Sequence, residues 1–490
     1  MPAIASFEYL LPTMVLLAGA LLVLLLDLLA GSERIASVAW PVTVLSVLGA
    51  AAASFTLVDQ GPLRVLSVLA YDGFTAYMWR LILLALAMVV LLSESYIRNH
   101  SREPGLYYAC VLFFGLGALV LAASSNLIML LLAVDFLSLV GYVLTGFLHY
   151  DKRSTEAAIK YLIYGSAVSA MMAYGLSWLY GLAGSADYAS TAEMITRGVS
   201  WPTSAMIQPF TLVPVLIFIL AGFSFKIGSA PFHQWLPDAF EGAPAPVAAA
   251  LAIVPKLSGF AALARFTMVT FPEGTTLGGL WRWPLVAFLA VGAMFVGNLI
   301  GLWQTNIKRL MAYSGIAQVG YALIGVATAS DRGLSGLLLY LTAYTVAEIG
   351  AFAAITVMSD RVGLETVEDY RGLYHRSPAL SAVLLISVLS LFGMPGTGGF
   401  MGKLWLFTSA VEDGRFGLLV VAALNSVLSL AYYWKIIRTT FIHTDYSLEP
   451  VSVPLASTIV LALSVAGVLL IGLYPNLVLA WAETAIQAFR

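Results

Sequence analysis

The chain has 490 residues, of which 60% are hydrophobic and only 10% are charged, and its mean hydropathy is +0.92. Soluble domains carry about 25% charged residues, so this composition excludes an ordinary soluble globular protein. The 24 Lys and Arg residues nearly balance the 26 Asp and Glu residues, and no basic run indicates a nucleic-acid partner. The apolar residues recur in blocks of about 20 separated by short polar breaks, which predicts many transmembrane helices.

Fourteen segments are long and apolar enough to be predicted as transmembrane helices. They cover residues 9–31, 37–57, 73–95, 106–123, 126–149, 157–182, 209–240, 246–270, 281–302, 309–329, 334–358, 378–410, 415–441 and 454–486. The N-terminus lacks a basic region and a small-residue cleavage site, so we expect a first span there and not a cleaved signal peptide.

The seventh and twelfth segments contain glycine and proline in their middle, in FSFKIGSAPFHQWLP and LFGMPGTGGFMGKLWLF. Such interruptions predict broken helices at membrane depth, and one broken helix in each half of the chain is compatible with an inverted repeat. The predicted fold class is an all-α polytopic membrane protein with two inverted five-helix repeats. The predicted units are residues 1–105 with three helices, 106–270 with helices 4–8, 281–441 with helices 9–13, and 454–490 as a C-terminal helix.

The loop charges predict the orientation of the chain in the membrane. Loops that follow odd-numbered spans are richer in basic residues, such as Arg98, Lys152 and Arg309, than loops that follow even-numbered spans. By the positive-inside rule the first set is cytoplasmic, so both termini are expected on the outer side. No loop exceeds about 26 residues, which leaves no room for a soluble catalytic domain.

Four charged residues lie deep inside predicted spans: Asp135 in the fifth, Lys226 in the seventh, Lys256 in the eighth and Lys403 in the twelfth. A charge at the bilayer centre costs about 2.5–3.5 kcal/mol on insertion scales, so such residues are usually functional. A lysine in an apolar site loses the hydration of its ammonium group and releases its proton more easily. A nearby carboxylate opposes that release. An Asp–Lys pair can therefore act as a proton switch.

Four further residues are weaker candidates for a proton route: His233 after the seventh-span break, Glu348 in the eleventh span, Lys160 and Lys435. His233 is as well explained as a cap of the broken helix, and Lys160 as a topology signal near the cytoplasmic loop. Snorkelling at a span end and helix-to-helix hydrogen bonding remain the structural alternatives for the buried charges.

Bound cofactors and metals are not expected on this chain. The single cysteine, Cys110, excludes intrachain disulfides and a cysteine-ligated iron–sulfur cluster. The five histidines are far apart in the sequence, and nucleotide and phosphate motifs are missing.

Several motifs closely resemble the family of antiporter-like membrane subunits of respiratory complex I. They are EAAIKYLIYGSAVSA, PFHQWLPDAFEGAPAPVAAALAIVPKLSGFAALAR, NLIGLWQTNIKRLMAYSGIAQVGYALIG, GLETVEDYRGL and GMPGTGGFMGKLWLF, in that family's order over most of residues 125–410. Within the family, EGAPAPV followed by VPK, and a lysine in the twelfth span where subunit M has glutamate, are similar to the subunit N branch.

The resemblance implies a role for each matched residue. Lys226 resembles the central lysine of the broken seventh span, Lys256 the connecting lysine of the eighth, and Lys403 the lysine near the exit path. Asp135 stands where the family normally has glutamate, so its side chain is one methylene shorter. His233 matches a family histidine after the break.

The resemblance also implies the setting: an H⁺-translocating subunit of NADH-quinone oxidoreductase in a bacterial inner membrane. Subunit M and small subunits such as K would be its membrane partners, and FMN, iron–sulfur clusters and quinone would belong to other subunits. A multisubunit cation/proton antiporter or membrane-bound hydrogenase of the same fold is the first alternative. A stand-alone secondary transporter is the second, although no cluster of diverse polar side chains suits a solute. A quinone-binding enzyme would need headgroup ligands, and no such set is defined.

Overall fold

The computed structural model describes residues 7–30, 32–57, 63–197, 212–363, 365–442 and 449–489, with side chains from residues 7–29, 37–57 and the later ranges. In chain order, the elements of the first half are η1 (Phe7–Leu10), α1 (Leu11–Ala30), α2 (Ser32–Thr56), β1 (Leu63–Val65), β2 (Leu69–Tyr71), α3 (Gly73–His100), α4 (Pro104–Ala123), α5 (Leu127–Thr145), α6 (Lys152–Ala183), α7 (Tyr188–Arg197), α8 (Val213–Ile227), α9 (Trp235–Gly242) and α10 (Ala245–Thr270). The elements of the second half are α11 (Thr276–Leu280), η3 (Trp281–Val286), α12 (Ala287–Gly301), α13 (Ile307–Thr328), α14 (Asp331–Val362), η4 (Val367–Tyr370), α15 (Leu373–Arg376), α16 (Pro378–Phe392), α17 (Gly398–Glu412), α18 (Phe416–Phe441), α19 (Leu455–Leu473), α20 (Asn476–Ile486) and η5 (Gln487–Phe489).

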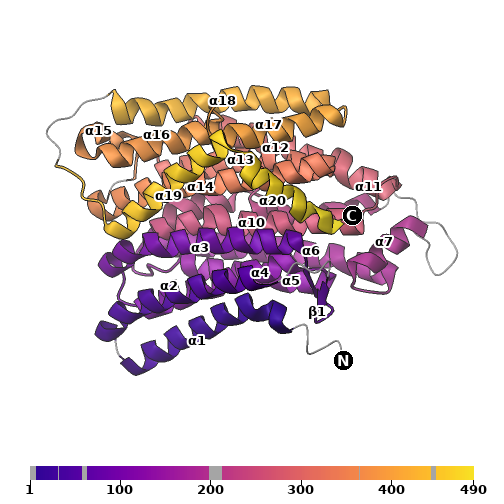
Figure 1. The fold of residues 1–490 in the computed structure, drawn as a ribbon, viewed down its shortest axis with the longest axis horizontal. Helices are drawn as coiled ribbons and strands as arrows, with labels where there is room; N and C mark the ends of the chain where they lie inside the picture. Colours follow the sequence, from indigo (N-terminus) through magenta and orange to yellow (C-terminus); the bar gives the residue numbers. More distant parts are fainter. Residues whose placement is uncertain are drawn as a thin grey trace.

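The long helices run roughly along one axis, as the sequence predicted for a bundle of membrane spans (Figure 1). Twelve of the described helices are long and apolar enough to cross a membrane. Two shorter apolar helices, α8 and α16, stand at the seventh and twelfth predicted segments. The number of fourteen spans therefore stays a prediction. Residue 31 and residues 209–211 of two predicted segments lie outside the described part of the chain.

Three helices form the interior of the bundle. The most apolar 18-residue window is 100% buried in α10 and 94% buried in both α13 and α14. The corresponding windows of α2, α6, α18 and α19 are only 33% buried, and they present large apolar side chains such as Leu48, Ile163 and Val427 at the surface. This difference is expected in a membrane, because lipid surrounds the outer helices and requires an apolar outer surface. Polar groups are therefore buried between the inner helices.

Both predicted interruptions are confirmed. Helix α8 ends at Gly228, whose φ of 75° is a left-handed conformation that favours glycine, and α9 begins seven residues later at Trp235. Helix α16 ends in the same way at Gly393, with a φ of 96°, before α17 begins at Gly398. The interruptions leave backbone carbonyls at helix ends inside the protein, where polar side chains can reach them.

The structure differs from the sequence prediction in three places. The segment 454–486 is two helices, α19 and α20, because Tyr474 and Pro475 interrupt it, and Pro475 has no backbone N–H to continue the first helix. A small antiparallel hairpin, β1–β2, precedes α3, where hydropathy gave only a loop. The short helix α7 also lies in a predicted loop, because its polar composition does not resemble that of a membrane span. The division of the chain into repeats stays a prediction.

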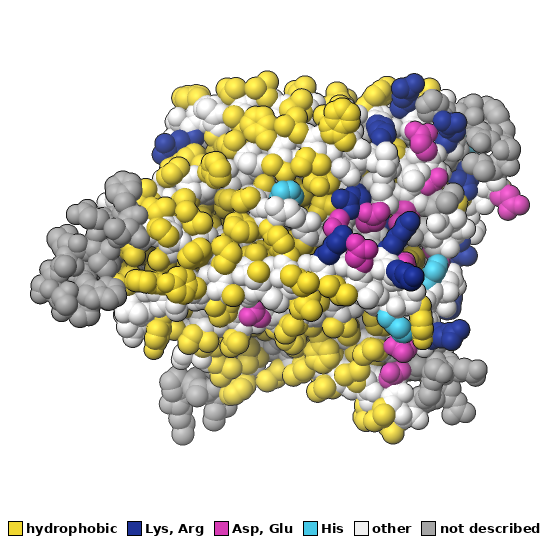
Figure 2. Space-filling model, turned by 180° about the vertical axis from the view of Figure 1, so that it is seen from behind, with side chains coloured by type: hydrophobic (Ala, Val, Ile, Leu, Met, Phe, Trp, Pro, Cys, Tyr) yellow, Lys and Arg dark blue, Asp and Glu magenta, His cyan; other side chains and the backbone are white. Residues whose placement is uncertain are grey.

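The two ends of the bundle differ in charge. Both termini lie at one end, together with α7, α11 and β1, and α15 lies at the other (Figure 1). Seen from behind, charged side chains of both signs gather toward that other end, and the remaining face is mostly hydrophobic (Figure 2). Three ion pairs found there join separate helices or loops: Lys160 to Asp238 (3.0 Å), Arg309 to Glu241 (2.9 Å) and Lys308 to Glu365 (2.7 Å).

Candidate functional site

Lys226 lies at the end of α8, immediately before the first interruption, and only 1% of its surface is exposed. Its ammonium donates to the Ser138 hydroxyl at 2.9 Å and to the Val134 carbonyl at 3.3 Å, both on α5. Asp135 lies on the same stretch of α5, but its carboxylate accepts a hydrogen bond from Ser169 of α6. Lys226 of α8 thus reaches the stretch of α5 that carries Asp135, but its direct side-chain partner is the Ser138 hydroxyl and not the Asp135 carboxylate.

Lys256 lies on α10, one helical turn from the place where that helix meets Lys226. At Gly259, a Cβ would stand 3.5 Å from Cγ of Lys226, so the stem of Lys226 packs directly on α10. A second glycine, Gly315 of α13, makes room for the other lysine, because a Cβ there would come within 2.3 Å of Lys256 Nζ. The stem of Lys226 thus meets α10 one turn from Lys256, and the ammonium of Lys256 lies against α13.

The ammonium of Lys256 donates to the hydroxyl of Tyr344 at 2.7 Å, and that hydroxyl donates to the Ala252 carbonyl at 3.1 Å. Lys256 itself is 2% exposed. Glu348 follows Tyr344 by one turn of α14 and is completely buried, and among the described residues neither carboxylate oxygen has a hydrogen-bond partner. Buried polar groups almost always have partners, so an unpartnered carboxyl at this depth indicates a group that shares a proton or binds water.

A small cavity connects Lys256 with the next polar group, Gln318 of α13. The space in it that the centre of a water molecule can occupy measures about 10 Å³. It is lined by Lys256, Gln318, Tyr340 and Tyr344, among other residues. A cavity needs roughly 10–15 Å³ of this kind of space to hold one water molecule. The Gln318 side-chain oxygen accepts from the Tyr340 hydroxyl, and its amide nitrogen donates to the Leu391 carbonyl at 2.8 Å.

Lys403 follows the second interruption on α17 and is 4% exposed. Its ammonium donates to the carbonyls of Leu391 (2.9 Å) and Phe392 (2.8 Å) and to the Ser426 hydroxyl (3.2 Å). Leu391 and Phe392 are the last residues of α16, so the lysine caps the negative end of a half-helix. The Leu391 carbonyl accepts from both Gln318 and Lys403, which completes a polar connection from Lys256 to Lys403. We call Lys226, Lys256 and Lys403 the lysine row.

The four weaker candidates occupy different environments. His233 is 8% exposed, its Nδ1 has no partner, and its ring lies 6.3 Å from that of Tyr313. Glu348 is next to the lysine row. Lys160 is half-exposed and pairs with Glu156 and Asp238 at the charged end of the bundle. Lys435 of α18 is partly buried and donates to the Gln304 carbonyl at 3.0 Å. The structure brings Glu348 to the row and leaves Lys160 and Lys435 outside it.

Sequence reasoning did not single out the neutral groups that join the charges: Ser138, Gln318, Tyr340 and Tyr344. Serine and tyrosine are common in apolar helices, and only Gln318, a lone amide in the tenth predicted span, carries a signal that hydropathy could have marked. A second missed feature is the buried ion pair of Arg265 with Asp72, with two contacts of 2.7 and 2.8 Å. Among the described residues there is no group of three or more His, Cys, Asp or Glu side chains that could hold a metal ion.

Comparisons with known proteins bear on the family and the fold of the chain. Residues 124–429 match the family model described as NADH:quinone oxidoreductase/Mrp antiporter, transmembrane. NADH-quinone oxidoreductase subunit N of Trichlorobacter lovleyi is 35% identical over 489 residues, which cover 98% of this chain and 97% of the relative.

Two solved structures share the fold. A chain of respiratory complex I from Thermus thermophilus superposes with a TM-score of 0.78 and 30% identity, over 96% of this chain and 98% of that one. A chain of the Mrp complex from Dietzia superposes with a TM-score of 0.82 over 98% of this chain and 97% of that one, at 20% identity, and shows the fold alone. This chain therefore belongs to the NADH:quinone oxidoreductase/Mrp antiporter family of antiporter-like membrane proteins.

Proposed function

We propose that this chain is a proton-translocating membrane subunit of a complex I-type NADH-quinone oxidoreductase. The observation that carries the proposal is the lysine row, three buried lysines on α8, α10 and α17. Lys226 packs against the helix of Lys256, and neutral polar groups with a small cavity connect Lys256 to Lys403. Burial of three lysines in one bundle is expensive, and the hydrogen bonds that each lysine makes to neutral groups do not by themselves account for this cost. The subunit N relatives support the assignment to complex I rather than to an antiporter complex.

In the proposed mechanism, different neighbouring groups control proton release at the two ends of the row. Asp135 and Ser138 on α5 influence how firmly Lys226 holds its proton. A change in the position or charge of Asp135 lets Lys226 pass a proton toward Lys256 on the adjacent turns of α10. Lys256 exchanges it with Glu348 and Tyr344, and a water molecule in the small cavity carries it toward Gln318. Lys403 receives it beside the end of α16 and releases it to the outer side.

This role places the redox chemistry elsewhere. FMN, iron–sulfur clusters and quinone would reside in other subunits, and this chain would bind neighbouring antiporter-like and small membrane subunits, of the M and K kinds, in a bacterial inner membrane. Both termini would lie on the outer side, since the charged end of the bundle faces the cytoplasm by the positive-inside rule. Asp135, Lys226, Lys256 and Lys403 would transfer protons, with Glu348 and His233 assisting. Lys160 and Lys435 lie outside the row and would act at most at its entrance.

A subunit of a multisubunit cation/proton antiporter is the second candidate, because the Mrp chain has the same fold. The two differ in partners: copurification with a peripheral arm that contains flavin and iron–sulfur clusters would identify complex I. Solute uptake by the purified chain alone in liposomes would instead indicate a stand-alone transporter.

The test of the proposal is Lys226→Ala in the assembled complex, reconstituted in liposomes. We expect proton translocation to fall sharply relative to quinone reduction, because the first proton-holding group of the row is lost. Lys152→Ala, at an exposed position at the start of α6, is the matched control and should leave translocation unchanged. Unaltered translocation by an assembled Lys226→Ala complex would refute the proposed route.

A further inference from the structure

An apolar groove of about 450 Å³ lies between α2, α3, α14 and α20, and none of the three lysines of the row lines it. Its walls include Leu48 of α2, Leu84 of α3 and Trp481 of α20, which are 53%, 42% and 65% exposed. Ligand sites typically measure about 300–1,000 Å³, so the groove is large enough for a small molecule or part of a lipid. Three of its four helices, α2, α3 and α14, are long and apolar enough to span a membrane, so we expect the groove to open toward lipid tails.

Arg80 is the one charged side chain that lines this groove. Its Nη2 donates to the Ser54 carbonyl at 3.0 Å, and its guanidinium lies 4.6 Å from the centre of the Phe55 ring. The Nε atom is enclosed and has no hydrogen-bond partner. No carboxylate of the described chain pairs with Arg80, although guanidinium is always charged in proteins. A positive charge in an apolar wall, without a carboxylate partner, favours the binding of an anion.

Arg80 lies near one end of α3, where we expect the edge of the hydrocarbon layer. Arg80 is seven residues after the start of α3 at Gly73, or about 10 Å along the helix axis. Its guanidinium reaches back to Ser54, near the end of α2 at Thr56. This is the snorkelling geometry of an arginine whose charge lies near the edge of the hydrocarbon layer. The planar guanidinium fits a phosphate through paired hydrogen bonds.

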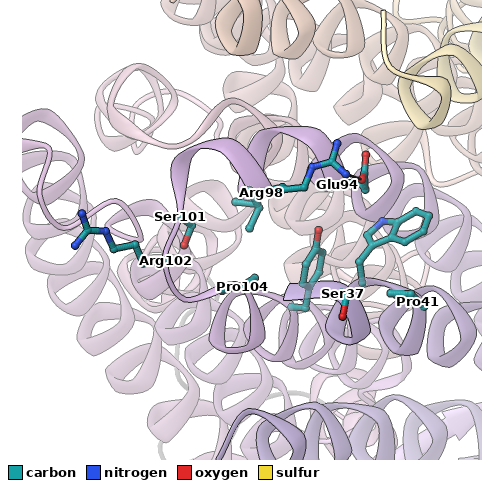
Figure 3. A pocket seen from close by; sticks show the side chains of 10 residues that line it. Ser37, Pro41, Glu94, Arg98, Ser101, Arg102 and Pro104 are labelled. Atoms are coloured by element: carbon teal, nitrogen blue, oxygen red, sulfur yellow. Dashed lines mark ion pairs between the residues drawn. The ribbon is translucent and has the colours of Figure 1, made fainter. Parts of the chain in front are cut away.

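A second cavity, at the opposite ends of α2 and α3, provides a contrast. It measures about 560 Å³ and contains Arg98 and Glu94, whose side chains pair at 2.8 Å (Figure 3). Arg102 at its rim lies apart from that pair (Figure 3). The positive charge of Arg98 is therefore already neutralised within the protein. The groove at Arg80 has no such internal partner, so its charge calls for an anion from outside.

We propose that the groove binds one anionic phospholipid, with the phosphate on Arg80 and an acyl chain along Leu48, Leu84 and Trp481. The lipid completes the charge balance of Arg80 and covers the apolar walls. The groove floor includes Thr342 of α14, whose hydroxyl is 2.6 Å from that of Tyr77 of α3. The bound lipid thereby contacts α14, the helix that also carries Tyr344 and Glu348. These residues follow Thr342 by two and six positions.

The experiment uses the intact complex and phosphatidylglycerol with a photoreactive acyl chain. After irradiation, labelled peptides are mapped by mass spectrometry. We expect labelling on α2, α3 and α20 around the groove. Arg80→Gln keeps a donor for the Ser54 carbonyl but removes the charge, and should lower labelling by about tenfold or more, since a charge-assisted contact is lost. Arg80→Lys should retain most of it.

Controls separate the possible occupants. Arg197→Gln, at an exposed arginine of α7 toward the same end of the bundle, should label as the unsubstituted chain does. Leu84→Trp narrows the groove without touching Arg80, so reduced labelling of this variant supports the site even if Arg80→Gln fails to assemble. Equal labelling of Arg80→Gln and the unsubstituted chain would overturn the proposal. So would displacement of the probe by inorganic phosphate alone, or groove labelling blocked throughout by a partner subunit.

Discussion

Replacement of Lys403 by methionine tests the exit end of the proposed proton route. Methionine keeps most of the side-chain volume and removes the ammonium, so effects of a new cavity stay small. The change deletes three hydrogen bonds, to the carbonyls of Leu391 and Phe392 and to the hydroxyl of Ser426. It also deletes the contact of the ammonium with the Tyr321 ring, whose centre is 4.4 Å away.

The effect of Lys403→Met on stability depends on which hydrogen bonds the carbonyls of Leu391 and Phe392 keep. The Leu391 carbonyl keeps the amide of Gln318 at 2.8 Å, and the Phe392 carbonyl keeps the Ser426 hydroxyl at 3.2 Å. No buried acceptor loses its last partner, and a desolvated cation is removed. We therefore expect a loss of about 1–2 kcal/mol, at the lower end of the range for charged hydrogen bonds. The chain should assemble normally, while proton transfer through this subunit should stop.

The assay is the ratio of protons translocated to quinone reduced by reconstituted complex, with thermal unfolding measured on the same preparations. Lys435→Met is the matched control, because Lys435 lies outside the row and has one carbonyl partner, that of Gln304. We expect Lys403→Met to lower the ratio and Lys435→Met to leave it unchanged. A Lys403→Met complex that assembles and translocates at the normal ratio would show that Lys403 is only a cap for α16.

Two more predictions concern groups that the sequence did not single out. Gln318→Leu should lower the translocation ratio with little effect on assembly, because it breaks the connection between the Tyr340 hydroxyl and the Leu391 carbonyl; a normal ratio would place the route elsewhere. Asp72→Asn should cost about 3–5 kcal/mol of unfolding free energy at neutral pH, since it leaves Arg265 buried without its partner. Burial alone would raise the pKa of Asp72, which directly precedes α3, but the charge and hydrogen bonds of Arg265 hold it below its usual value. The contribution of Asp72 is therefore complete above its unfolded pKa of about 3.9 and is lost as pH falls through the lower folded value. Thermal unfolding of the detergent-purified chain at neutral and acidic pH should show the two proteins converge on acidification, and a constant difference would contradict the linkage.

The sequence by itself determined the class of the protein and the positions of its rare charges. Hydropathy marks a membrane bundle because lipid requires long apolar helices, and Gly228 and Gly393 lie in breaks that composition alone reveals. Asp135, Lys226, Lys256 and Lys403 stand out for the same reason, since a charge in an apolar run is costly. Hydropathy does not mark the break at Tyr474–Pro475, because Asn476 is the only strongly polar residue near it.

Only the tertiary structure decided which polar groups meet. Ser138 and Lys226 are 88 residues apart in the sequence and 2.9 Å apart in space, and Lys256 and Tyr344 are likewise 88 residues apart and hydrogen-bonded. These contacts depend on the packing of α5, α8, α10 and α14 and leave no local pattern. The same holds for Arg80, whose surroundings distinguish a lipid-facing cation without a counter-ion from a paired one such as Arg265. Hydropathy locates a charge along a helix, but its neighbours come from other helices, and their identity is a property of the folded bundle.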